Sequence, residues 1–307
     1  MTTYAPDYYK EFKCIKNLCK HNCCIGWEIQ IDDDTRKKYL SDKNDFSNKI
    51  RENITKGDDC HFILKEDLRC PFLNGCNLCE IITNLGKDYL CQICSDHPRY
   101  INLFETRKET GLGLCCEAAA KIILSKKDKV CFIPLNDETT PTDEEKEFFD
   151  LRQSLLDIIQ NRNLNIKERI KNLNTGVENI SFEKIFDILY NLEKLDCSWN
   201  DSLQLLNSSL PFSEIELDLD FQVAFEQLLV YFIARHLSDA YFDFREEVAI
   251  SFAVFSTMAI MGLCSGLLNE HGKFDFDVLL DFARAYSAEI EYNEENLDNI
   301  FSELESI

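Results

Sequence analysis

The position of its cysteines is the feature that most constrains this chain. It has 15 cysteines in 307 residues, and all but Cys197 and Cys264 lie at or before Cys131. Met1 to Lys20 contains no apolar run of signal-peptide length, so we expect a cytoplasmic protein whose thiols are kept reduced. Clustered thiols in that compartment are more typical of metal ligands than of disulfides. The cysteine-rich part is therefore expected to fold around a metal.

Charge separates the chain into the same two parts. The first 135 residues carry 21 basic and 20 acidic side chains, whereas the remaining 172 carry 12 and 35. This contrast predicts a cysteine-rich domain at residues 1–135, which binds a metal or an iron–sulfur cluster, and an acidic helical domain at residues 136–307. The formal net charge of −22 argues against a nucleic-acid groove, so we expect no nucleic-acid partner.

Helical patterns dominate the second part. Thr142 and Glu145 have the spacing of a capping box, and Ser181 can cap a further helix. Apolar residues cover nearly the whole circumference of two predicted helices and only one side of two more. The four segments are 221–237, 248–268, 276–286 and 297–304. The first part offers only short helices, near 35–39 and 117–124, and a short strand at 27–31. We predict a mainly α protein, with an irregular cysteine-rich metal-binding N-terminal domain followed by an all-α helical bundle.

Val248 to Leu268 is long enough to cross a membrane, because it has 21 residues and no charged side chain. However, it contains serines, a threonine and glycines, and its flanks are Arg245-Glu246-Glu247 and Glu270-His271 rather than a Lys or Arg anchor on one side with aromatic belts. We therefore expect a buried helix and no membrane partner.

The cysteine spacing alone leaves two kinds of metal site open. Cys76-x2-Cys79 and Cys91-x2-Cys94 resemble a zinc ribbon, whereas an iron–sulfur cluster would use more scattered thiolates. One class is excluded. Cys19-x3-Cys23 has Gly26 where a third cysteine would complete the usual radical S-adenosylmethionine loop.

A series of short motifs in the first 125 residues is more specific. In chain order the motifs are Cys14, Cys19, Cys23-Cys24-Ile25-Gly26-Trp27, Ile31-Asp32, Thr35, Tyr39, Cys70-Pro71-Phe72-Leu73, Leu78-Cys79, Cys94, His97-Pro98-Arg99 and Leu114-Cys115-Cys116-Glu117-Ala118-Ala119. Together these motifs resemble the flagellin lysine-N-methylase family, which is related to a broader group of cysteine-rich zinc- or iron-chelating proteins. We expect the C-terminal helices to match that family only as a generic helical continuation.

The resemblance implies methyl transfer from S-adenosylmethionine to lysine ε-amino groups of flagellin, with a 4Fe–4S cluster held by the cysteines. The implied metal ligands are Cys14, Cys19, Cys23, Cys24, Cys70, Cys79, Cys94 and Cys116. Cys116 is preferred to Cys115, although this sequence lacks the proline that the family has after the cysteine. The alternatives are a non-catalytic zinc-binding interaction module and an iron–sulfur redox or sensor protein.

Lysine methylation requires a neutral amine, whereas the pKa of free lysine is about 10.4. Asp32, Tyr100 and Glu117 are candidates to assist proton removal, because they stand near the motifs. Gly111-x-Gly113 lacks the third glycine of a dinucleotide-type turn, so the cofactor must bind elsewhere. Arg99 is the candidate for a bidentate contact with the cofactor carboxylate.

Overall fold

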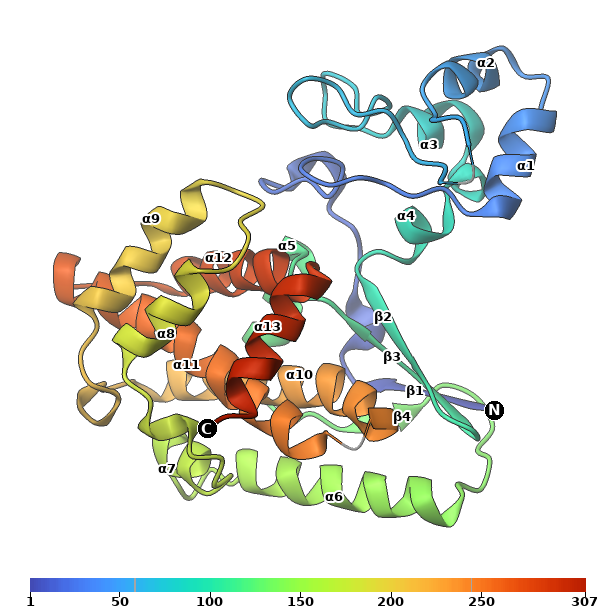
Figure 1. The fold of residues 1–307 in the computed structure, drawn as a ribbon. Coiled ribbons are helices and arrows are strands. Elements are labelled where there is room, and N and C mark those ends of the chain that lie inside the picture. Colours follow the sequence, from blue (N-terminus) through green and yellow to red (C-terminus); the bar gives the residue numbers. More distant parts are fainter. Residues whose placement is uncertain (58, 244) are drawn as a thin grey trace. The chain divides into compact units, whose positions relative to one another are not determined.

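A computed structural model of the chain describes residues 1–57, 59–243 and 245–307, which form two compact units. One unit consists of residues 13–99 and is called the cysteine unit here; the other consists of residues 1–12 and 100–307 and is called the helical unit. This division differs from the predicted boundary after residue 135. The segment from Tyr100 onward folds with the helices, and so does the N-terminal strand (Figure 1).

A small sheet explains why residues 100–135 belong to the helical unit. Its strand order is β2-β3-β1-β4. The strands are β1 (Thr2–Pro6), β2 (Arg99–Leu103), β3 (Arg107–Leu112) and β4 (Phe132–Pro134). β1 runs parallel to β3 and antiparallel to β4, with Tyr4 opposite Pro134. The first residues of the chain are therefore paired with segments more than 100 residues away.

Helices make up most of the helical unit, which confirms the mainly α prediction. They are α5 (Glu117–Ser125), α6 (Asp143–Ile159), α7 (Ile166–Lys171), α8 (Phe182–Tyr190), α9 (Ser198–Gln204), α10 (Leu219–Asp243), α11 (Glu246–His271), α12 (Phe276–Tyr286) and α13 (Glu294–Leu304). The 3-10 turns are η1 (Tyr9–Glu11), η4 (Val177–Asn179), η5 (Leu205–Ser208) and η6 (Phe212–Glu214), and η7 (Ser287–Glu291) is a π-helical turn. Thr142 and Glu145 form the predicted capping box, and Ser181 caps α8.

The long apolar helix α11 lies in the interior of this unit. In the part of the chain that is described, it is the one helix long and apolar enough to span a membrane, but 89% of its apolar window is buried inside the protein. Its glycines have a packing reason. A Cβ on Gly266 would come within 1.9 Å of the Leu205 carbonyl oxygen, and one on Gly262 would meet Leu206 and Phe182 at 2.7 Å. These glycines let η5 and α8 approach α11 closely.

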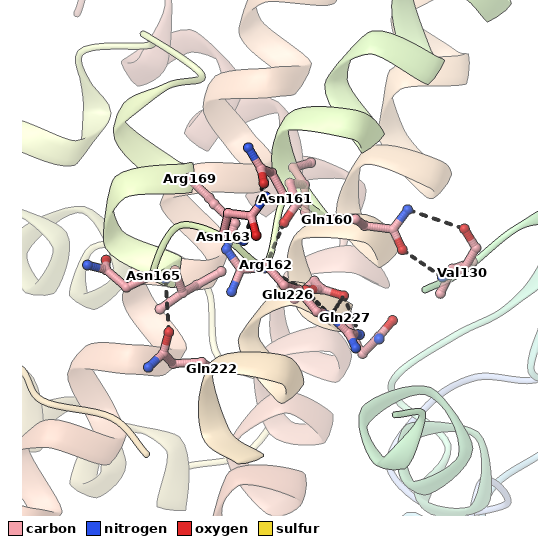
Figure 2. A network of polar contacts seen from close by, with 12 residues as sticks. Val130, Gln160, Asn161, Arg162, Asn163, Asn165, Arg169, Gln222, Glu226 and Gln227 are labelled. Atoms are coloured by element: carbon pink, nitrogen blue, oxygen red, sulfur yellow. Dashed lines mark hydrogen bonds and ion pairs between the residues drawn. The ribbon is translucent and has the colours of Figure 1, made fainter. Parts of the chain in front are cut away.

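A buried ion network joins α7 and the α6–α7 connection to α10 (Figure 2). The Glu226 carboxylate on α10 is fully buried, and it accepts hydrogen bonds from Arg162 at 2.8 Å and Arg169 at 2.5 Å. Next to it, the Gln160 side chain accepts from the Val130 amide at 2.6 Å and donates to the Val130 carbonyl at 3.3 Å. Because the buried carboxylate has two cationic partners, its desolvation is compensated.

The cysteine unit contains shorter elements and a smaller core. Its elements are η2 (Lys16–Leu18), α1 (Asp33–Ser41), α2 (Asp45–Glu52), α3 (Glu80–Leu85), η3 (Lys87–Tyr89) and α4 (Gln92–Asp96). The strand expected at residues 27–31 is wrong: isolated bridges pair Ile25 with Arg69 and Gln30 with His61 instead. The buried apolar cluster of this unit includes Cys60, Cys70 and Cys91 among its members.

Candidate functional site

Six thiols of the cysteine unit gather into one group, called the thiol cluster here. Its members are Cys23, Cys24, Cys70, Cys79, Cys91 and Cys94. Cys24 interacts electrostatically with Cys23, Cys70 and Cys79, while Cys94 interacts with Cys91, Cys24 and Cys70. Two pairs are in hydrogen-bonding contact, Cys23 with Cys24 and Cys91 with Cys94. The cluster therefore collects cysteines from four separate stretches of sequence.

Backbone contacts hold these stretches together. The Cys70 amide donates to the Cys24 carbonyl at 2.8 Å, which fixes the first stretch against the second. Leu73 and Cys79 form a bridge that brings the third stretch back to the second. Cys79 and Cys91 occupy the positions immediately before α3 and α4, so the start of each short helix presents a thiol to the cluster.

Backbone amides also point at several of the sulfurs. The Phe72 amide donates to Cys70, the Ile81 and Ile82 amides donate to Cys79, and the Cys94 amide donates to Cys91. Burial raises the pKa of Cys70 to about 11 and also raises that of Cys79, while the hydrogen bond from Cys24 lowers the pKa of Cys23 to about 7. Amide donors of this kind stabilise thiolate charge and tune iron–sulfur clusters.

The donor set of the thiol cluster fits a metal that prefers sulfur. Within residues 1–57, 59–243 and 245–307, no three His, Cys, Asp or Glu side chains stand in a ready-made metal-binding arrangement. The thiols are grouped and hydrogen-bonded in pairs rather than directed at one point. Four thiolates suffice for a tetrahedral zinc site or for one cubane cluster, so six grouped thiols provide enough ligands for either.

The structure brings together five of the eight predicted ligands and adds one that was missed. The missed residue is Cys91, which is 1% exposed; its spacing from Cys94 was visible in the zinc-ribbon pattern. Cys14 is exposed and accepts from the Lys16 amide, and Cys19 donates to the His21 carbonyl. Cys116 belongs to the helical unit, where it immediately precedes α5.

The other predicted site residues have local roles in the structure. Asp32 caps α1 and accepts from the Thr35 and Gln92 amides at 2.9 and 2.7 Å. Burial opposes its ionisation, but these hydrogen bonds prevail and lower the pKa of Asp32. Arg99 begins β2 and is half-buried, and Glu117 is the first residue of α5. Asp32 is thus better explained as a helix cap than as a proton acceptor.

Tyr100 lies beside a buried polar cluster that sequence reasoning missed, called the Glu291 cluster here. The Glu291 side chain is fully buried and accepts from the Tyr231 hydroxyl at 2.9 Å, and it lies 2.6 Å from His236 Nε2 and 3.2 Å from Arg235 Nε. Burial opposes ionisation of Glu291, but Arg235 and His236 lower its pKa. Arg235 and His236 are adjacent in the otherwise apolar stretch 228–237 of α10, which is the sequence signal that could have found them.

The helical unit also contains a cavity of about 350 Å³. Arg107 and Arg152 line it, and both pair with the buried carboxylate of Glu109. The Arg107 guanidinium lies 3.8 Å from the ring centroids of both Tyr4 and Phe149. Both cations are thus paired and stacked within the unit, and the cavity lies between strands of the sheet and α6.

Comparison with known proteins connects the chain to one family. Residues 173–306 match the model described as the FliB lysine N-methylase C-terminal domain. The flagellar biosynthetic protein FliU of Salmonella muenchen is 30% identical over 135 residues, which cover 42% of this chain and 80% of FliU. The chain belongs to the flagellin lysine N-methylase family. The match to residues 173–306 corrects our expectation that the C-terminal helices would resemble the family only generically.

Longer relatives carry the enzyme name. The proteins called lysine-N-methylase in Salmonella typhimurium strain LT2 and Salmonella choleraesuis strain SC-B67 are each 30% identical over 135 residues, again 42% of this chain. The match spans about a third, 34%, of the length of each. No solved structure matches the chain.

Proposed function

We propose that this protein is an S-adenosylmethionine-dependent protein lysine N-methyltransferase that acts on flagellin in the cytoplasm. The main support for this proposal is the sequence similarity to proteins named lysine-N-methylase. The acidic part of the chain supports it, because a net negative surface attracts lysine-bearing segments and speeds encounter.

The thiol cluster is the proposed metal site. Cys23, Cys24, Cys70, Cys79, Cys91 and Cys94 would supply the ligands of a 4Fe–4S cluster, with zinc as the alternative. A bound cluster would provide a Lewis-acidic iron. The residues of this chain gather the sulfurs, direct backbone amides at three of them, and bury Cys70 and Cys91 away from solvent.

The methyl-transfer step makes defined demands on the protein. The neutral lysine nitrogen attacks the methyl carbon, the carbon–sulfur bond breaks, and S-adenosylhomocysteine leaves with the electron pair. The amine must first lose its ammonium proton to a base or to solvent. Burial raises the pKa of Tyr100, so at neutral pH this residue is a phenol that can hold an amine by hydrogen bonding rather than remove its proton.

The test combines metal analysis with methyl transfer. The full chain is purified anaerobically, its iron, zinc and acid-labile sulfide are measured, and labelled S-adenosylmethionine is supplied with flagellin. Iron with sulfide and labelled flagellin lysines are expected. Zinc without sulfide and without labelling would favour a non-catalytic zinc module, while iron with sulfide but no labelling would favour a redox or sensor protein.

A further inference from the structure

The Arg235 side chain is held in place by buried residues and is also partly exposed at the surface. Its side chain is 12% exposed, and its guanidinium lies between two aromatic rings, 5.5 Å from the Tyr100 centroid and 4.8 Å from the Tyr292 centroid. Tyr292 is 44% exposed, so the two rings and the guanidinium are accessible to solvent on the Tyr292 side. A guanidinium that packs against two rings and stays partly exposed is a candidate anion receptor.

The inner side of Arg235 is locked by the Glu291 cluster. Arg235 Nε faces the Glu291 carboxylate at 3.2 Å, and one Nη donates to the Tyr231 hydroxyl at 2.9 Å. Glu291 ends the π-helical turn η7, and such turns are often found at functional sites. The guanidinium is therefore held in one orientation before any ligand arrives.

The outer side of Arg235 is less well satisfied. The Nη that donates to Tyr231 also contacts the Tyr292 hydroxyl at 3.5 Å, and the second Nη contacts the Glu291 carbonyl at 3.4 Å; both of these contacts are at the outer limit of hydrogen bonding. A guanidinium has five N–H donors, and a planar carboxylate can accept two of them side by side. The Tyr292 hydroxyl and the Cys115 thiol are in contact with each other at the same place and add two polar groups.

We propose that the outer edge of Arg235, between Tyr100 and Tyr292, binds a carboxylate, and that this carboxylate belongs to the amino-acid end of S-adenosylmethionine. The assignment rests on the proposed function. It moves the carboxylate contact from Arg99, the candidate chosen from the sequence, to the helical unit. Burial raises the pKa of Tyr292, so its hydroxyl keeps a proton, which it donates to the Cys115 thiol in the free protein and would donate to the carboxylate when the ligand binds.

One acidic group competes for this site. Asp239 lies one turn further along α10, is exposed, and interacts electrostatically with Arg235 and His236. A carboxylate ligand would meet repulsion from Asp239 and attraction from Arg235. Removing the Asp239 charge should therefore strengthen binding, which gives the proposal a variant whose effect has the opposite sign.

The test compares two ligands that differ only in the carboxylate. Calorimetry on the metal-loaded full chain measures the affinities for S-adenosylmethionine and for its decarboxylated analogue. We expect the wild type to prefer the carboxylated ligand by about tenfold or more, since one charge-assisted contact is worth that much. Arg235→Lys keeps the positive charge beside Glu291 but loses the two parallel N–H donors of the guanidinium. This variant should lose most of the preference for the carboxylated ligand. Tyr292→Phe should weaken it severalfold, and Asp239→Asn should increase it.

Matched controls are Arg99→Lys and Tyr190→Phe, because Tyr190 is exposed on α8 and stacks on Phe186. Both should keep the wild-type preference. Equal affinity of the wild type for the two ligands would overturn the proposal, as would loss of the preference in Arg99→Lys alone. A wild type that binds neither ligand would overturn the proposed function as well.

A second arm tests the other source of a carboxylate, an acidic side chain of flagellin. The same variants are titrated with flagellin in the absence of S-adenosylmethionine. Unchanged flagellin affinity in Arg235→Lys supports the cofactor assignment. Reduced flagellin affinity with an intact ligand preference would overturn it. Should Arg235→Lys fail to fold by circular dichroism, the opposite changes expected for Tyr292→Phe and Asp239→Asn decide the question.

Discussion

The two units of this protein are held together in different ways. The helical unit has a continuous apolar core that runs through α10 and α11 and includes residues from the sheet and α5. The cysteine unit has a separate, smaller apolar cluster in which three of the buried residues are cysteines. Burial of apolar area is the dominant favourable term in folding, so the helical unit has much more intrinsic stability. With the proposed metal site, we expect metal ligation to supply the stability that the smaller core of the cysteine unit does not provide.

Metal removal should separate the two units most clearly. We expect chelation of a metal-loaded sample to expose residues 13–99 to hydrogen exchange, because the thiol cluster would lose its ligand bonds. Residues 100–307 should keep their protection and most of the helical circular dichroism signal. Hydrogen exchange by mass spectrometry measures both units in one sample. Unchanged protection of residues 13–99 after complete metal loss would contradict the dependence on metal.

A single substitution in the thiol cluster should reproduce part of this effect. Cys70→Ser removes a sulfur that is 4% exposed and that accepts an amide hydrogen bond. We expect metal affinity to fall at least about tenfold. Cys76→Ser is the matched control, since Cys76 is exposed in the same unit and outside the thiol cluster. Elemental analysis of both variants checks the prediction, and equal metal content would count against it.

In the helical unit the largest effect of one charge should come from Glu226. Glu226→Gln leaves Arg162 and Arg169 around a neutral group, and we expect a loss of about 3 to 5 kcal/mol in the free energy of unfolding. Urea denaturation followed by circular dichroism measures it. Glu183→Gln, an exposed position on α8, should change stability little. A similar loss in both variants would show that the ion network is not the cause.

The smallest predicted effect concerns the start of α6. Thr142→Ala removes the side chain that accepts from the Glu145 amide and breaks the capping box. The expected cost is about 1 kcal/mol. Ser154→Ala, at an exposed position within the same helix, serves as the comparison. Thermal unfolding of the two variants distinguishes loss of the cap from a general effect of alanine.

Local patterns predicted local structure well in the helical unit. The capping box of α6, the Ser181 cap and the limits of α12 were readable because each depends on residues within one or two turns. The boundary after residue 135 followed charge and cysteine content, which carry no information about the pairing of β1 with β3 and β4. The role of Cys91 and the Glu291 cluster were missed for the same reason, because contacts distant in sequence create both.

The position of β1 makes the cysteine unit an insertion within the helical unit, since the chain enters it after Phe12 and leaves it at Arg99. Unfolding of the insertion would turn it into a long flexible loop between two segments of the same unit. Closing such a loop is inexpensive in entropy, because each doubling of its length costs only about 0.6 kcal/mol. The helical unit can therefore be synthesised, fold and persist before a metal is delivered. With the proposed metal site, metal loading would be a late maturation step that does not require turnover of the protein.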